Sequence, residues 1–162
     1  MTSQPTRLPA SPPSTDILLV LDSPLEIELT LRPLQESDVS PHIEVARDGE
    51  EALDFLLARG AFRHRLGAPL PRLVLLDLKL ARLDGFEVLR ALRGNPRTCM
   101  TPVVVLTSST DSRQLAQCYQ LGANSCIKKP VRYDEFWGAI QTLARYWLDF
   151  NEPPPSTATP VT

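Results

Sequence analysis

The chain has 162 residues, of which 17 are basic and 19 are acidic, giving a formal net charge of −2. This near balance provides no electrostatic basis for binding nucleic acid or an anionic membrane, and no apolar run approaches the roughly 20 residues needed to span a bilayer. The cysteines, Cys99, Cys118 and Cys126, lack the CxxC spacing of zinc sites and do not suggest a disulfide framework, so we expect a soluble protein of the reducing cytoplasm.

Proline, serine and threonine dominate both ends of the chain, in residues 1–15 and 151–162. Such segments bury too little apolar surface to offset the entropy lost on ordering, so we expect flexible tails there. The folded unit is expected to be one domain over residues 16–150, long enough for a sizeable core.

Five short strands are expected along this domain. The runs at 17–21, 73–76 and 102–106 are continuously apolar, as in strands buried on both faces of a parallel sheet. Residues 42–46 alternate between apolar and polar, which indicates an edge strand. Residues 125–128 form a short fifth strand.

Helical patterns follow each of these runs, over residues 25–37, 49–60, 85–93, 111–121 and 133–148. Pro33 is expected to kink or shorten the first helix, because proline removes an internal hydrogen bond. Residues 60–71 contain two glycines and two prolines and are expected to form a long loop.

The strand–helix unit is thus repeated five times, which predicts an α/β fold, (βα)5, built on a doubly wound five-stranded parallel sheet with right-handed crossovers. The flavodoxin-like strand order 2-1-3-4-5 is consistent with an exposed second strand.

Chemically active side chains follow the first, third, fourth and fifth strands. In the expected strand order, Asp22, Asp77, Thr107 and Lys129 meet in one crevice at the carboxyl edge of the sheet. Two acids can hold Mg²⁺ through oxygen ligands, and a carboxylate can attack phosphorus as a nucleophile. An ammonium group can neutralise phosphoryl oxygens, and a hydroxyl can donate a hydrogen bond to one of them.

These landmarks resemble the receiver domains of two-component response regulators, over about residues 16–148. The resemblance implies that Asp77 is the phosphoacceptor and that Asp22 is the metal-binding acid after the first strand. It also implies that Thr107 is the switch hydroxyl and that Lys129 is the invariant-type lysine of the site. In this family that lysine precedes a proline, here Pro130, through a peptide bond that is usually cis.

Further positions match the same family. The backbone carbonyl of Lys79 is implied as a metal ligand beside Asp22 and Asp77, and the Asp84-Gly85 pair follows the phosphoacceptor loop as in other receivers. The insertion at 60–71, the absence of an output domain and the long aromatic final helix are similar to the single-domain response regulators served by bacterial phytochrome kinases.

The resemblance implies a phosphorelay protein that accepts a phosphoryl group on Asp77 from a sensor histidine kinase, such as a bacteriophytochrome, in an Mg²⁺-dependent reaction. Its enzymatic activity would be limited to self-phosphorylation and autodephosphorylation. Neither nucleic acid nor membrane is an expected partner.

The sequence departs from the family at two of these positions. Leu21 stands where receivers carry a first acid, so we expect weaker Mg²⁺ binding. Cys126 replaces the aromatic switch residue, and we expect a small packed side chain there rather than a redox sensor. These departures motivate an alternative, a pseudo-receiver that binds partners without phosphorylation.

Two enzymatic or cofactor-carrying alternatives are weaker. A true phosphotransferase would normally carry an acid where Lys79 stands, together with a substrate cap. A flavodoxin-type flavin carrier would have a polar, acid-free loop after the first strand, where this chain has Asp22.

The last expected helix has a second apolar stripe, formed by Trp137, Ala144 and Leu148. Two stripes on one helix suggest a partner, so we expect a homodimer. The candidate contact residues are Trp137, Tyr146, Trp147, Leu148 and Phe150. The alternative for Trp137 is that it covers a neighbouring helix.

Overall fold

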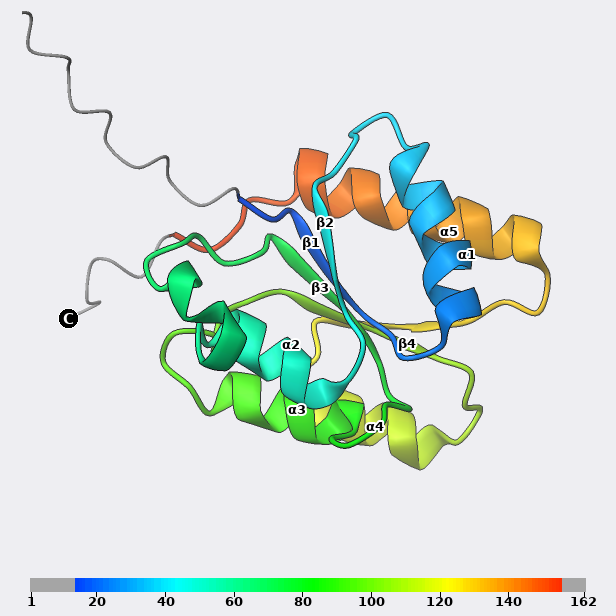
Figure 1. Ribbon diagram of the computed structural model, residues 1–162. Coiled ribbons are helices and arrows are strands. Elements are labelled where there is room, and N and C mark those ends of the chain that lie inside the picture. The colour runs from blue at the N-terminus through cyan, green and yellow to red at the C-terminus, as the bar shows by residue number, and fades with distance from the viewer. Residues whose placement is uncertain (1–13, 156–162) are drawn as a thin grey trace, which may run out of the picture.

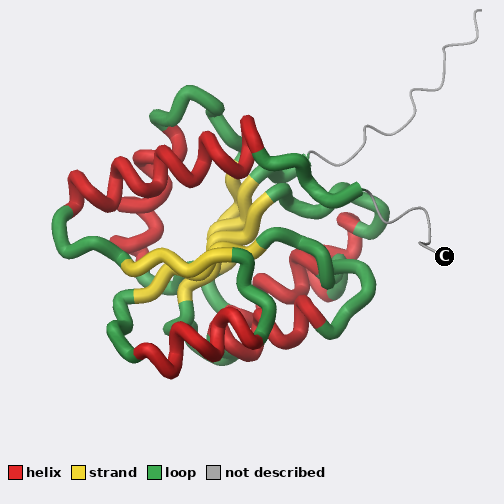
Figure 2. The backbone as a smooth tube through the Cα atoms, turned by 180° about the vertical axis from the view of Figure 1, so that it is seen from behind, coloured by secondary structure: helices red, strands yellow, loops and turns green. Residues whose placement is uncertain are grey.

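The computed structural model describes residues 14–155, so most of the tails expected at 1–15 and 151–162 lies outside the described residues. A five-stranded sheet with the order β2-β1-β3-β4-β5 lies between two layers of helices (Figure 1). Helices α1 and α5 cover one face, and α2, α3 and α4 cover the other; the view from behind shows the same three layers (Figure 2). The expected α/β fold and strand order are confirmed.

All strand pairs are parallel. The strands are β1 (Ile17–Val20), β2 (Ile43–Ala46), β3 (Leu73–Asp77), β4 (Val103–Thr107) and β5 (Ser125–Lys128). Strands β1, β3 and β4 are buried along their whole length, whereas β2 is partly exposed at the edge of the sheet, as its alternating sequence predicts. Asp77 pairs in register with Leu106, so β3 and β4 end side by side.

The helices are α1 (Pro24–Gln35), α2 (Gly49–Leu56), α3 (Gly85–Arg93), α4 (Ser112–Gln120) and α5 (Tyr133–Arg145). A short 3₁₀ helix, η1 (Gly60–Arg65), follows α2, and a π-helical turn, η2 (Tyr146–Phe150), extends α5. The first four α-helices begin after a Ser or Asp side chain that accepts a hydrogen bond from a backbone N–H of the first turn.

Pro33 lies inside α1, which ends at Gln35, two residues before the expected end near Ser37. The helix continues for two residues beyond Pro33. Proline has no N–H to donate to the carbonyl of Leu29, but the hydroxyl of Tyr133 donates to that oxygen at 3.1 Å. A side chain of α5 thus satisfies the group that Pro33 leaves without its usual partner.

The segment 60–71 is not a plain loop, because its first half is η1. Arg65, at the end of η1, is buried and its guanidinium lies 3.6 Å from the centroid of the Phe55 ring. Stacking of a planar cation on an aromatic ring, which is a tertiary contact, anchors this segment to α2.

Two residues of the second apolar stripe expected on the final helix, Ala144 and Leu148, do not form a free face. Ala144 and Leu148 are buried against the sheet together with Ile140 and Leu143, and Trp147 packs on the same core. Two residues of the expected free face therefore belong to the core beneath α5 and η2. Of the five candidate dimer residues, Tyr146 and Phe150 are exposed and Leu148 is excluded from a free surface.

Candidate functional site

A crevice of about 650 Å³ lies at the carboxyl edge of the sheet. It is lined by the four residues that are predicted to meet there, Asp22, Asp77, Thr107 and Lys129. Glu26, Lys79 and Asp84 also line it. The predicted convergence of the strand ends is therefore observed.

Asp77 is the last residue of β3 and is only 5% exposed. Its Oδ1 accepts a hydrogen bond from the backbone N–H of Lys79 at 3.2 Å, and its Oδ2 accepts one from the ammonium of Lys129 at 2.9 Å. Charge-assisted hydrogen bonds of this kind compensate the desolvation of a buried carboxylate. Asp77 is thus held in the crevice, in contact with a cation.

Thr107 and Lys129 are linked through the backbone. Lys129 follows β5, and its N–H donates to the carbonyl of Thr107 at 2.8 Å. The Oγ1 of Thr107, at the end of β4, accepts from the N–H of Ser109 at 3.0 Å. The hydroxyl proton of Thr107 is not used in that bond and can be donated to another acceptor.

Asp22 lies just beyond β1 and is exposed. Its Oδ2 accepts from the N–H of Ala81 at 3.2 Å, which connects it to the loop after β3. Leu21 is 1% exposed and packs in the core beneath α1 and α5, and it does not line the crevice. A carboxylate is therefore missing at this position, and an apolar contact replaces it.

The donor atoms fit a hard cation such as Mg²⁺. Asp22 and Asp77 provide carboxylate oxygens in the same crevice. Lys79 also lines this crevice, and its backbone carbonyl is the expected third ligand. Among residues 14–155, no group of three or more His, Cys, Asp or Glu side chains could hold a metal. Two carboxylates suit Mg²⁺, which usually retains several waters and is bound through one or two protein carboxylates.

Two tightly packed glycines hold the loop between β3 and α3 in place. A Cβ on Gly85 would lie 2.5 Å from the Asp77 carbonyl oxygen and 2.7 Å from the Leu78 Cα. A Cβ on Gly49, at the start of α2, would lie 2.8 Å from the Leu83 Cβ. Gly85 is predicted by the resemblance, whereas the role of Gly49 has no signal in the sequence, because it depends on a contact between distant segments.

Arg82 contributes to the same loop. It has a positive φ of 69°, a conformation that L-residues rarely adopt. Its guanidinium lies 3.8 Å from Asp48 and 3.5 Å from Glu50, both at the start of α2. The loop beside Asp77 is thus tied to α2 by charge as well as by close packing.

Cys126 on β5 is half-buried, and burial raises the pKa of its thiol. Burial and the neighbouring Cys126 raise the pKa of Cys118, on α4, to about 12. Both thiols are therefore protonated at neutral pH, which agrees with a packed residue at position 126 and not with a reactive thiolate.

The expected cis peptide bond before Pro130 is not found. The described residues contain no cis peptide bond, so Lys129–Pro130 is trans. The prediction came from resemblance alone and is wrong for this structure; the trans isomer is favoured intrinsically by roughly 0.5–1 kcal/mol, and local packing decides between the two.

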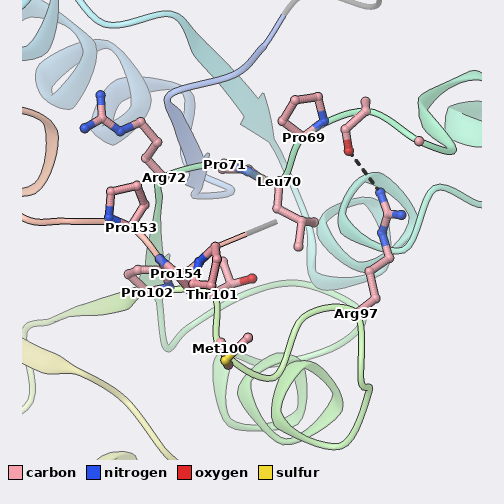
Figure 3. A pocket seen from close by; sticks show the side chains of 13 residues that line it. Pro69, Leu70, Pro71, Arg72, Arg97, Met100, Thr101, Pro102, Pro153 and Pro154 are labelled. Atoms are coloured by element: carbon pink, nitrogen blue, oxygen red, sulfur yellow. Dashed lines mark hydrogen bonds between the residues drawn. The ribbon is translucent and has the colours of Figure 1, made fainter. Parts of the chain in front are cut away.

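A second cavity, of about 510 Å³, lies at the opposite, amino-terminal edge of the sheet. Prolines from three segments line it, among them Pro69, Pro102 and Pro153, together with Arg72 and Arg97 (Figure 3). Within the described residues it contains no acid, and Arg97 donates to the backbone carbonyls of Leu56 and Ala68. The groups suited to phosphoryl chemistry thus lie in the other crevice.

Comparison with known proteins agrees with the geometry of that crevice. The family model of the response regulator receiver domain matches residues 17–141. The chain belongs to the response regulator receiver family. Members of this family are signalling proteins of two-component systems that act with a histidine kinase, and receiver domains generally bind Mg²⁺.

Two curated relatives cover most of this receiver chain. FilR2 of Methanothrix harundinacea (strain 6Ac), described as a probable methanogenesis regulatory protein, is 38% identical over 85% of this chain and 86% of its own length. The response regulator Rcp1 of Synechocystis sp. is 34% identical over 86% of this chain and 92% of its own length.

Solved structures that are similar to this receiver include response regulators described as phytochrome-linked. The phosphorylated cyanobacterial phytochrome response regulator RcpA has a TM-score of 0.80 and 31% identity, covering 88% of this chain and 100% of RcpA. The bacteriophytochrome response regulator AtBRR has a TM-score of 0.68 and 43% identity, covering 87% of this chain and 100% of its own. An Mn²⁺-bound form of Rcp1 is also similar, with a TM-score of 0.79 and 33% identity over 87% of this chain and 99% of Rcp1.

None of the helices within residues 14–155 combines the length and apolar character needed to cross a membrane.

Proposed function

We propose that Asp77 accepts a phosphoryl group from the phosphohistidine of a sensor kinase, in a reaction that requires Mg²⁺, and that phosphorylation changes the surface offered to partners. The observation that carries this proposal is the 2.9 Å contact between the Asp77 carboxylate and the Lys129 ammonium inside a crevice shared with Asp22. Such a pair holds a buried nucleophile beside the cation that its phosphorylated form needs.

The proposed transfer forms a bond between a carboxylate oxygen of Asp77 and phosphorus as the bond from phosphorus to the kinase histidine breaks. The histidine leaves as an imidazole and takes up a proton. Lys129 neutralises the phosphoryl oxygens, and the Thr107 hydroxyl donates a hydrogen bond to one of them. Asp22, Asp77 and the Lys79 carbonyl would hold Mg²⁺, which supplies further positive charge for those oxygens.

The protein's own catalysis, in this proposal, is limited to self-phosphorylation from small phosphodonors and hydrolysis of the aspartyl phosphate. We propose a bacteriophytochrome as the kinase, because RcpA and AtBRR are both described as phytochrome response regulators. We also propose a cytoplasmic location and partners other than nucleic acid or membrane, in line with the net charge of −2.

Metal dependence separates this proposal from a pseudo-receiver that works without phosphorylation. With acetyl phosphate and excess Mg²⁺, we expect intact-mass spectrometry to show one added phosphate, and with EDTA we expect none. We also expect weak Mg²⁺ binding in calorimetry, because Leu21 supplies no charge to the crevice. No labelling in the presence of Mg²⁺ would favour the pseudo-receiver, and equal labelling with and without Mg²⁺ would contradict the proposed Mg²⁺ requirement.

We propose a homodimer whose contact includes Tyr146 and Phe150 of η2, which are 50% and 64% exposed. Replacing both by Ala should raise the dimer dissociation constant at least tenfold, since each buried aromatic contributes roughly 1.5–3 kcal/mol. Multi-angle light scattering over a concentration series measures this change. Tyr119→Ala on α4 removes an equally exposed tyrosine, at 51%, and serves as the control. A dimer unaffected by the double substitution, or a monomeric wild type, would contradict the assignment.

A further inference from the structure

We propose that Glu26 supplies the acidic charge that Leu21 does not, and that it acts as a positioning residue for Mg²⁺ and Lys129 in the phosphorylation site. This inference rests on the proposed function and adds to it a residue that none of the sequence landmarks identifies. Glu26 lies in the first turn of α1 and lines the same crevice as Asp22 and Asp77.

The contact that places Glu26 in the site is its ion pair with Lys129. The Lys129 ammonium lies 3.3 Å from Oε1 of Glu26 and 2.9 Å from Oδ2 of Asp77. The Lys129 side chain is only 16% exposed, so both carboxylates interact with a largely desolvated cation. One ammonium group therefore bridges the expected phosphoacceptor and Glu26.

The direction of the Glu26 side chain is informative because its sequence position predicts a different one. Ser23 caps α1, and a glutamate three residues after such a cap normally bonds back to the N–H of the capping residue. In α3, Glu87 does this and accepts from the N–H of Asp84 at 3.1 Å.

Helix α2 uses its glutamate locally as well. Glu51, three residues after the cap at Asp48, accepts from the N–H of Arg47 at 3.2 Å. In α1 the cap itself is made, because Ser23 accepts from the N–H of Glu26 at 3.4 Å, but the Glu26 carboxylate reaches Lys129 instead of returning to the cap. Of these three cap-and-glutamate pairs, α1 alone sends its carboxylate into the crevice.

The charges lining the crevice explain what Glu26 adds. Two ammonium groups, Lys79 and Lys129, line it together with the acids. Without Glu26, the Lys129 ammonium would have Asp77 as its one ion-pair partner among the described residues. Glu26 offsets part of this positive charge, which favours a divalent cation near Asp77.

Glu26 acts through its charge and through water rather than as a direct ligand. No group of three acidic side chains within the described residues is close enough to coordinate one metal. A carboxylate one water molecule away from Mg²⁺ still attracts it, and Mg²⁺ keeps much of its hydration in protein sites.

The test is Mg²⁺ binding to the unphosphorylated protein, measured by isothermal titration calorimetry on wild type and Glu26→Gln. The amide keeps the size of the side chain and an oxygen that can accept from Lys129, but it removes the charge. We expect the Mg²⁺ dissociation constant to rise roughly tenfold, as for the loss of one unit charge several ångströms from a dication in partly screened surroundings.

Two further variants separate charge from structure. Glu28→Gln removes the same charge from the same helix at an exposed position paired with Arg32, outside the crevice, and should leave the constant unchanged. Glu26→Asp keeps the charge and should restore most of the affinity. Thermal unfolding of each variant verifies that it is folded.

A change of less than twofold in Glu26→Gln, an equal change in Glu28→Gln, or a wild type that binds no Mg²⁺ would overturn the role of Glu26. Labelling of wild type by acetyl phosphate on Asp77 tests the proposed function separately. A labelled wild type whose Mg²⁺ affinity does not depend on Glu26 would leave the function standing and remove this inference alone.

Discussion

Asp77→Asn should reduce phosphorylation by acetyl phosphate or by a histidine kinase roughly 100-fold or more, because the amide has no anionic oxygen to attack phosphorus. Asparagine has nearly the same shape as aspartate and can still accept from the Lys79 N–H, where Oδ1 of Asp77 accepts at 3.2 Å. Lys129 keeps Glu26 as an ionic partner, so the fold should be retained. Phosphorylation is measured by intact-mass spectrometry and the fold by circular dichroism.

The control for Asp77→Asn is Asp134→Asn, which removes one carboxylate from the exposed start of α5, where Asp134 pairs with Arg132. It should be labelled as fully as wild type. Full labelling of folded Asp77→Asn would show that another residue receives the phosphoryl group.

Gly85→Ala should lower the free energy of unfolding by about 3 kcal/mol and Tm by about 6–12 °C. The new Cβ would overlap backbone atoms of Asp77 and Leu78, at 2.5 and 2.7 Å, and backbone atoms cannot rotate away as a flexible side chain can. The end of β3 must therefore move, and Asp77 moves with it. Thermal denaturation measures the stability, and the rate of labelling by acetyl phosphate should fall in the same variant.

Gly138→Ala is the matched control for that substitution. Gly138 lies inside α5, and a Cβ there meets no heavy atom within 4 Å. Alanine in a helix interior is favoured over glycine by roughly 0.5–1 kcal/mol, so this variant should be slightly more stable than wild type. A Gly85→Ala protein as stable as Gly138→Ala would contradict the tight packing described at Gly85.

The fold could be predicted because local patterns and the chain order agree with it. Continuous apolar runs at β1, β3 and β4 have few stable arrangements other than the middle of a parallel sheet, and the alternating β2 fits its edge. The predicted strand order also places Asp77, Thr107 and Lys129 in one crevice, because neighbouring parallel strands end at the same edge of the sheet.

The features that could not be predicted from the sequence depend on contacts between distant segments. Pro33 has no N–H to donate to the Leu29 carbonyl, and the Tyr133 hydroxyl of α5 donates a hydrogen bond to that oxygen instead. Arg65 orders the segment after α2 by stacking on Phe55. Leu148, in η2, is buried in the core and does not belong to a surface stripe. None of these contacts has a signal in the local sequence.

Glu26 was missed for a different reason. Its position three residues after Ser23 fits a capping motif, and such a motif accounts for a glutamate without any role in a site. The direction of its side chain toward Lys129 can be seen only in three dimensions, where α1 and the end of β5 lie together.

The most direct test of the phosphoacceptor assignment is to locate the modified residue chemically. After transfer from a phosphorylated histidine kinase, borohydride reduction converts an aspartyl phosphate into homoserine, and peptide mass spectrometry identifies its position. We predict homoserine at position 77 alone, and only when Mg²⁺ is present during transfer. Homoserine at another aspartate, or none despite a phosphorylated kinase and Mg²⁺, would contradict the assignment of Asp77 as the phosphoacceptor.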